Sequence, residues 1–320
     1  MTHHIALSHA SSVAAEAILE KLPESGIASD SLVLLDQPSN LGKRVAFGGS
    51  HLALLDQQQY DFSNCALLLM PEADPELEAS VLQQGCLLVS HAIADQRAPV
   101  FIGAGGIGDS DRPSISYSET QLRLVGPELS CLLPALTELD DLAGIAQLQV
   151  TLMRSTEFRG KAGIDELASQ TVNLLSSRDI ETGVYSQQIA FNLLPEATSP
   201  QVEADFRHFL GNSSCSIALQ TVNVPIFHGL AAAVQIGFSA ETTPEDCERR
   251  LSAVDNLTIK NTDSSPISDC NQSFSCVISH LKQAPNQPPN LQFWMVADPM
   301  RYGLANNYVN VADFLLKSFL

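Results

Sequence analysis

HIALSHASSVAAEAILEKLP, residues 4–23, decides how the chain begins to fold. The apolar run His4–Leu7 predicts a short strand. Val13–Leu22 then carries alanine and leucine at helical spacing, and Pro23 ends the predicted helix. A strand, a short turn and a helix are the opening of a βαβ unit, so this stretch favours a parallel sheet.

Short apolar runs continue to alternate with helical segments through the first half of the chain. Strands are expected at Ser31–Leu35, Cys65–Met70 and Cys86–Ser90, a hairpin at Val45–Leu55 around Gly48 and Gly49, and a helix at Pro75–Gln84. These strands are apolar throughout, as in a parallel sheet that is covered on both faces. The sequence therefore predicts an α/β protein.

The pattern changes beyond Pro127, which indicates a second domain. Strands are expected at Gln147–Met153, Cys215–Val224, Ala232–Phe238 and Leu291–Val296, and helices at Leu129–Leu142, Gly163–Leu175 and Gly303–Leu320. Thr243 followed by Pro244 predicts the start of another helix, with a capping hydroxyl and proline at its first position. Residues 261–290 are rich in Ser, Asn, Pro and Asp and predict a loop.

Charge and cysteine content exclude several classes of partner. The 36 acidic and 17 basic residues give a formal net charge of −19. A surface this negative repels phosphate backbones and anionic lipids, so nucleic-acid and membrane partners are not expected. No export signal or membrane-spanning run is visible. The seven cysteines are scattered without zinc-site spacing, which predicts free thiols in a reducing cytoplasm and no metal site.

Two segments are candidates for a dinucleotide loop. Gly103–Gly108 reads GAGGIG and matches G-x-G-x-x-G, but the polar residues 109–113 follow it in place of a helix, so a turn is expected there. The turn Leu7–Ala15 lies where such a loop belongs, between the first strand and the first helix, yet it contains no glycine. A diphosphate needs accessible backbone amides and often a positive φ, which glycine supplies at least cost.

Four side chains outside these loops are candidates for catalysis. His228 is a candidate general base, and a loop histidine satisfied by its neighbours is the alternative. Cys131 is a candidate nucleophile, and a buried, inert helix residue is the alternative. Glu128 and Glu157 are single acids with no partner evident in the sequence.

Three stretches resemble the aspartate-semialdehyde dehydrogenase family and, within it, the Usg-like branch: GKAGIDEL at 160–167, IAFNLLP at 189–195 and FWMVADPMRYG at 293–303. The resemblance implies an α/β fold with a Rossmann-like N-terminal domain, residues 1–128, completed by the C-terminal helix within residues 299–320. It also implies a central α/β (α+β) dimerisation domain, residues 129–298, and a homodimer.

The positions to which the resemblance assigns chemistry carry other side chains. The family's loop glycines fall at His9, Ser12 and Ala15, its NADP 2′-phosphate arginine at Ser39, its nucleophilic cysteine at Leu129, its glutamine at Arg154, its substrate arginine at Asn223 and its general-base histidine at Leu230. Leucine supplies neither a thiolate nor a proton acceptor.

Cys131 and His228 each lie two positions from a lost catalytic residue and are the candidate substitutes. On a helix, a two-residue offset turns a side chain by about 200°. We therefore expect neither residue to replace the missing group.

These observations favour a dimeric binding or interaction protein that lacks dehydrogenase catalysis and needs no cofactor. The alternative is an NAD(P)-dependent oxidoreductase, with NADP as cofactor, acting on aspartate semialdehyde or a related aldehyde in amino-acid biosynthesis. A third hypothesis is a sensor that binds a small molecule in the interdomain cleft through Arg154, Glu157 and Arg159. Against it stands the interpretation of these residues as surface charges on a loop.

Overall fold

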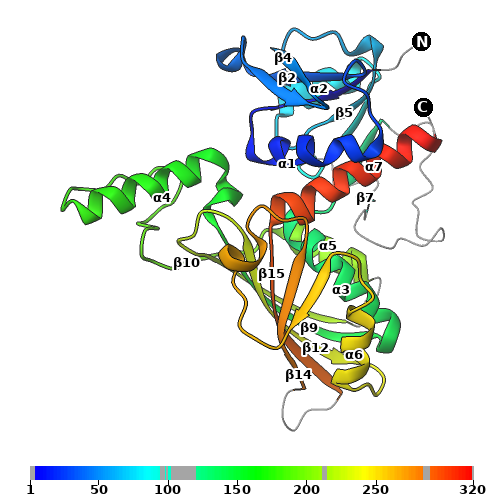
Figure 1. Cartoon of the computed structure of the whole chain (residues 1–320), viewed down its shortest axis with the longest axis vertical. Helices are drawn as coiled ribbons and strands as arrows, with labels where there is room; N and C mark the ends of the chain where they lie inside the picture. The colour runs from blue at the N-terminus through cyan, green and yellow to red at the C-terminus, as the bar shows by residue number, and fades with distance from the viewer. Residues whose placement is uncertain are drawn as a thin grey trace. The chain divides into compact units, whose positions relative to one another are not determined.

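The computed structural model describes residues 4–93, 98, 100–101, 120–210, 215–283 and 289–318. The chain divides into two compact units (Figure 1). Unit 1 is Met1–Gly126 with Leu304–Leu320, and unit 2 is Pro127–Gly303. The sequence had placed these boundaries at residues 128 and 299.

Unit 1 is built on an eight-stranded sheet in the order β3-β4-β2-β1-β5-β6-β8-β7. Its strands are β1 (His4–Leu7), β2 (Leu32–Asp36), β3 (Arg44–Phe47), β4 (Ser50–Asp56), β5 (Cys65–Leu69), β6 (Leu87–Ser90), β7 (Val100–Phe101) and β8 (Gln121–Leu124). All neighbouring strands are parallel except the hairpin β3–β4. The predicted parallel α/β sheet and the hairpin around Gly48 and Gly49 are both confirmed.

The α-helices in the described part of this unit are α1 (Val13–Lys21), α2 (Pro75–Gln83) and α7 (Asn306–Ser318). Ser12 and Asp74 cap α1 and α2, because their side-chain oxygens accept the backbone N–H of Ala15 and Leu77 at 3.2 and 3.0 Å. Helix α7 comes from the end of the chain and contacts α1 (Figure 1). The expected Rossmann-like domain completed by the C-terminal helix is therefore present.

Buried Tyr308 fixes α7 to the ends of the central strands. Its hydroxyl donates to the carbonyl of Met70 at 2.9 Å and accepts the backbone N–H of His91 at 3.2 Å. The imidazole Nδ1 of His91 lies 3.1 Å from the same hydroxyl. Burial lowers the pKa of His91 to about 4.

Unit 2 contains a seven-stranded mixed sheet in the order β10-β11-β9-β12-β15-β14-β13. Its strands are β9 (Ile145–Arg154), β10 (Leu194–Glu196), β11 (Ser216–Asn223), β12 (Leu230–Phe238), β13 (Leu257–Lys260), β14 (Cys276–Lys282) and β15 (Asn290–Ala297). Its helices are α3 (Pro127–Ala143), α4 (Gly160–Leu175), α5 (Pro200–Leu210) and α6 (Pro244–Leu251). Helix α3 is buried along most of its length and contacts α5, α6, β9 and β12.

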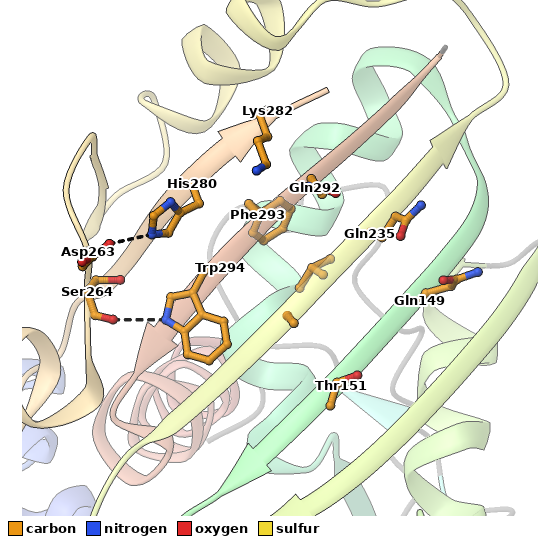
Figure 2. Close-up of a pocket in the computed structure, with 12 residues that line it drawn as sticks. Gln149, Thr151, Gln235, Asp263, Ser264, His280, Lys282, Gln292, Phe293 and Trp294 are labelled. Atoms are coloured by element: carbon orange, nitrogen blue, oxygen red, sulfur yellow. Dashed lines mark hydrogen bonds and ion pairs between the residues drawn. The ribbon is translucent and has the colours of Figure 1, made fainter. Parts of the chain in front are cut away.

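The sheet of unit 2 also has a hollow that is lined by polar side chains. Gln149, Gln235 and Gln292 lie side by side on three neighbouring strands, and together with Trp294 they line a hollow of about 590 Å³ (Figure 2). The indole N–H of Trp294 donates to the carbonyl of Ser264 at 3.2 Å.

The prediction of a loop over residues 261–290 is wrong. This range contains the short π-helix Pro266–Cys270 and the strand β14. The strand begins with the apolar run Cys276–Ile278, whose residues are buried. The sequence analysis missed this strand because it judged residues 261–290 by their overall composition. Most of these residues are polar and turn-forming, and the apolar run is only three residues long.

The buried imidazole of His91 predicts a loss of stability in acid. In the unfolded chain His91 titrates near its ordinary value of 6.5, but the folded state resists protonation down to about pH 4. The free energy of unfolding should therefore fall by about 3 kcal/mol from this residue as the pH drops from 7 to 4. Urea unfolding at both pH values measures the change.

The matched variant is His91→Asn, which does not titrate in this range. Its stability should depend less steeply on pH than that of the unmodified chain. Equal pH dependence in the two proteins would show that His91 is protonated freely in the folded state.

Candidate functional site

The turn between β1 and α1 is held by its own chain. His9 adopts a φ of +50°, the left-handed conformation that favours glycine. Its Nε2 lies 3.2 Å from the amide nitrogen of Gln57 and 3.5 Å from the carboxylate of Asp74. Burial lowers the pKa of His9, although the two acids Asp74 and Asp36 act to raise it. The resemblance assigns the first loop glycine to residue 9. In this chain the His9 side chain is there, and it contacts Gln57 and Asp74 on neighbouring loops.

Four successive backbone N–H groups in this turn already have acceptors within the protein. The N–H of His9 donates to Gln57 Oε1 at 3.4 Å, that of Ala10 to the carbonyl of Leu35 at 3.0 Å, that of Ser11 to Asp36 Oδ2 at 2.7 Å, and that of Ser12 to the carbonyl of His9 at 2.8 Å. A bound diphosphate relies on free amides at this place in the fold. Here those amides are occupied.

Asp36, the last residue of β2, supplies the anion at this turn. The residue is 2% exposed, and its carboxylate also accepts the N–H of Gln37 at 2.7 Å and the side-chain amide of Asn40 at 2.8 Å. Burial would raise its pKa, but the hydrogen bonds from Asn40, Ser11 and Gln37 lower it below its ordinary value. Asp36 is therefore an ionised carboxylate beside the N-terminus of α1.

Further acids surround the same turn. Asp74 lies against His9, and Glu72 interacts with the side chain of Ser12, while burial raises the pKa of Glu72. Ser39, where the resemblance implies an arginine for the 2′-phosphate, is exposed in the short turn Pro38–Asn40. The turn is thus bordered by the acids Asp36, Asp74 and Glu72, and Lys43 and Arg44 lie on the neighbouring hairpin side.

The sheet of unit 2 brings three of the chemically assigned positions into one row. Asn223 on β11 lies opposite Arg154 on β9, and Arg154 lies opposite Leu230 on β12. Leu194 on β10 extends the row beyond Asn223. The three positions to which the resemblance assigns an arginine, a glutamine and a histidine are therefore adjacent in the sheet.

Helix α3 contributes the position of the nucleophile. Leu129 lies in its first turn and is buried. Leu230, which lies opposite Arg154 in the sheet, is buried as well. Cys131, one of the two candidate substitutes, is also buried on α3, and burial raises the pKa of its thiol well above the ordinary range. A Cβ placed on Gly303 would lie 3.1 Å from its sulfur, so the backbone there packs closely against it. This thiol has the character of a core residue.

Arg154 is the centre of an ion-pair network that includes Glu128, Glu196 and Arg159. The guanidinium of Arg154 contacts the carboxylate of Glu128, and its other nitrogen lies 3.8 Å from Glu196. Glu196 also accepts from Arg159 at 2.7 Å and from the side-chain amide of Asn223 at 2.8 Å. Two expectations are therefore wrong: Glu128 has a partner, and Arg154, whose side chain is 12% exposed, is not a surface charge.

Glu157 and His228 form a second pair. Glu157 is 3% exposed and accepts from the hydroxyl of Ser155 at 3.0 Å and from the N–H of Gly229. Its other oxygen lies 3.1 Å from Nδ1 of the half-exposed His228, and this hydrogen bond raises the pKa of the histidine. Glu157 is thus neither unpartnered nor at the surface, which corrects both expectations.

The structure also corrects the geometric argument about His228. This residue lies in the loop before β12, and Leu230 opens that strand, so the helical rotation applies only to Leu129 and Cys131. The other candidate for a dinucleotide loop, Gly103–Gly108, lies outside the described residues. Within the described ranges, no group of three or more His, Cys, Asp and Glu side chains is placed to hold a metal ion, and no helix is long and apolar enough to cross a membrane.

Comparison with known proteins identifies the family. The model of the semialdehyde dehydrogenase dimerisation domain matches residues 136–302, which is more than half of the chain. The chain belongs to the aspartate-semialdehyde dehydrogenase family. This confirms the resemblance drawn from the three stretches quoted above and the fold that it implies.

Family members of two kinds are similar to this chain over its whole length. Aspartate-semialdehyde dehydrogenase 2 of Vibrio cholerae is 26% identical, with 99% of this chain and 98% of that protein aligned. The USG-1 protein homolog of Pseudomonas aeruginosa is 25% identical, with 99% and 98% aligned. The chain is therefore similar, at nearly equal identity, to a dehydrogenase and to a USG-1 homologue.

A solved structure from the family has the same fold. The crystal structure of aspartate semialdehyde dehydrogenase II from Vibrio cholerae superposes with a TM-score of 0.89, at 25% identity and 99% coverage of both chains. The similarity therefore extends across both units.

Several residues that build the site were missed by the sequence analysis. Asp36, Glu196 and Gln57 form no motif, and each is separated in sequence from the groups it binds. Asp36 alone left a usable signal, since it ends an apolar strand of a parallel sheet, where ligand-binding acids are often found.

Removal of the Arg154 side-chain charge should destabilise the protein. Arg154→Met leaves Glu128 buried without its cation, and breaking one side of a buried ion pair costs about 3–5 kcal/mol. The exposed pair Arg249–Asp246 provides a control, because Arg249→Met should cost less than about 1 kcal/mol. Urea unfolding measures both changes, and similar costs for the two variants would contradict a buried network.

The His228–Glu157 pair predicts a titration that depends on the carboxylate. Because the folded pKa of His228 is raised, its contribution to stability is present below the unfolded value near 6.5 and is lost as the pH rises through the folded value. Glu157→Gln should lower the pKa of His228, measured by NMR titration of the imidazole protons. An unchanged pKa would mean that the hydrogen bond does not hold the proton.

Proposed function

We propose that this chain is a non-catalytic member of the aspartate-semialdehyde dehydrogenase family that acts as a dimeric binding or interaction protein. The observation that carries the proposal is the pair of buried leucines, Leu129 and Leu230, at the family's nucleophile and base positions. Oxidation of an aldehyde through a thiohemiacetal requires a thiolate to attack the carbonyl carbon, and an alkyl side chain has no lone pair for that step. Cys131 is a poor substitute, because its raised pKa keeps it protonated at neutral pH.

Loss of dinucleotide binding is the second part of the proposal. The N–H of Ser11 in the turn before α1 already donates to the Asp36 carboxylate, so it is not available to a phosphate. His9, Ser12 and Ala15 add Cβ atoms where the family has glycine, and Ser39 supplies no charge for a 2′-phosphate. We infer that no cofactor is bound.

A homodimer is the assembly that fits unit 2. The matching family model is that of a dimerisation domain, and one face of the seven-stranded sheet carries a hollow of about 590 Å³ that includes Gln149, Gln235 and Trp294 (Figure 2). Val172 and Leu175 on α4 are 59% and 76% exposed, which is apolar surface that association would cover. The net charge of −19 and the seven free, buried cysteines support a cytoplasmic location without nucleic-acid or membrane partners.

The second candidate is an NAD(P)-dependent oxidoreductase acting on aspartate semialdehyde or a related aldehyde. The His228–Glu157 pair favours it, because a carboxylate that orients an imidazole is the arrangement of a general base. Asp36 then bears on the choice of cofactor: a carboxylate at the end of β2 accommodates the ribose hydroxyl of NAD and repels the extra phosphate of NADP.

Thermal unfolding with each dinucleotide tests the proposal. A ligand present at 100 times its dissociation constant stabilises a protein by about 2.7 kcal/mol. We expect no change in melting temperature with NADP or NAD. A clear shift, followed by phosphate-dependent reduction of the cofactor in the presence of aspartate semialdehyde, would establish the oxidoreductase.

A double variant tests catalysis and cofactor binding separately. Leu129→Cys with Leu230→His restores a thiol and an imidazole at the family positions but leaves Asp36 in the turn. We expect the variant to remain inactive with NADP. Dehydrogenase activity in this variant would show that the turn still accepts the cofactor and that only the catalytic side chains had been lost.

A further inference from the structure

Cys65 and Cys86 lie next to each other at the start of two neighbouring strands of unit 1. Cys65 is the first residue of β5, and Cys86 directly precedes β6. The two strands are parallel, with Leu67 opposite Leu87. The same register, continued by one residue, places Cys86 opposite Ala66, the neighbour of Cys65. Adjacent strands lie about 4.8 Å apart, so the two cysteine backbones are within the range that a disulfide bridges.

A β-bulge brings both side chains to the same face of the sheet. The pairing of β1 with β5 shifts register between His4 and Ile5, which leaves one extra residue, Ala66, on β5. Such a bulge changes the strict alternation of side chains that a regular strand keeps. Cys65 and Cys86 accordingly belong to one buried cluster in the core of unit 1.

The two thiols contact each other within this cluster. A hydrogen bond between them lowers the pKa of Cys65 and raises that of Cys86, because the Cys86 thiol keeps its proton as the donor. The thiolate is the reactive form of cysteine, and a neighbouring donor stabilises it. Cys65 is therefore the nucleophile of the pair, and Cys86 is the thiol that can resolve an oxidised Cys65.

The pair lies at the border between the core and the exposed turns of unit 1. Cys65 and Cys86 are 5% and 1% exposed, but Asn64 and Gly85, the residues directly before them, are exposed. The half-buried ring of Tyr60 packs against the same cluster. Hydrogen peroxide is nearly as small as water, so this thin cover admits it more readily than a larger reagent.

We propose that Cys65 and Cys86 are a redox site of unit 1, which hydrogen peroxide converts to a reversible disulfide. The sulfur of Cys65 attacks a peroxide oxygen, the O–O bond breaks, and the departing hydroxide takes the thiol proton and leaves as water. The sulfur of Cys86 then attacks the resulting sulfenic acid, the S–O bond breaks, and a second water forms.

Two thiols thereby lose two electrons and two protons, and one peroxide is reduced to two waters. The site goes beyond the proposed function, because it requires neither a catalytic side chain in unit 2 nor a bound dinucleotide. In a reducing cytoplasm a disulfide of this kind is transient, since thiol exchange returns it to the free thiols.

Mass spectrometry of the full chain tests the redox site. The folded protein is treated with hydrogen peroxide, quenched with catalase and then alkylated with N-ethylmaleimide in denaturant. We expect two of the seven cysteines to escape alkylation, and all seven to react after reduction with dithiothreitol. Proteolysis at the glutamates between the two cysteines should yield peptides that are linked through Cys65 and Cys86.

Two variants control the assignment. Cys86→Ala should form no disulfide and should leave Cys65 as a sulfenic acid that dimedone labels. Cys247→Ala removes a buried thiol whose neighbour is the hydroxyl of Thr242, and it should form the same disulfide as the unmodified chain. Circular dichroism checks that both variants are folded.

Full alkylation of the unmodified chain after peroxide treatment would overturn the proposal, as would linked peptides that join other cysteines. These two readouts need no variant, so they decide the matter even if Cys86→Ala proves unfolded. Disulfide formation in a folded Cys86→Ala variant would equally refute the pairing.

Discussion

The contact between the guanidinium of Arg154 and the carboxylates of Glu128 and Glu196 is the constraint on which the central part of unit 2 depends. It joins the first turn of α3, the end of β9 and the strand β10 at one point. Two acids taken out of water without a cation would cost several kcal/mol, so none of the three residues is independently replaceable. The side chains of Glu128, Arg154 and Glu196 therefore stabilise one another at this point of unit 2.

Unit 1 shows a similar change in a different place. The parallel sheet still directs its strand ends toward the turn before α1, which is where this fold binds dinucleotides. In this chain a carboxylate from the neighbouring strand, Asp36, bonds to Ser11, and His9 accepts the backbone conformation that glycine favours. The architecture is retained although the chemistry of the ligand site has changed, which illustrates that fold alone does not specify function.

Much of the fold was predictable from local patterns. Apolar runs and capping residues located β1, α1, α2 and the helix that begins after Thr243, because these signals lie within a few residues of the element that they define. The strand β14 was missed, since its apolar run is only three residues long and the strand is placed by pairing with β13 and β15. The partners of Glu128 and Glu157 were also missed. Each is contributed by a strand or loop remote in sequence, and single-chain periodicity carries no information about such contacts.

The internal carboxylate of Asp36 constrains the order in which this turn can evolve. A group attached to the same chain competes with a free ligand at an effective concentration of order millimolar or higher. Restoring a glycine at residue 9, 12 or 15 would therefore change little while the acid remains in place. Replacement of the acid would have to come first, at the expense of three hydrogen bonds and with no cofactor yet bound to compensate. If the proposed function holds, this first change lowers stability before any ligand can offset the loss, and the turn therefore tends to keep its present arrangement.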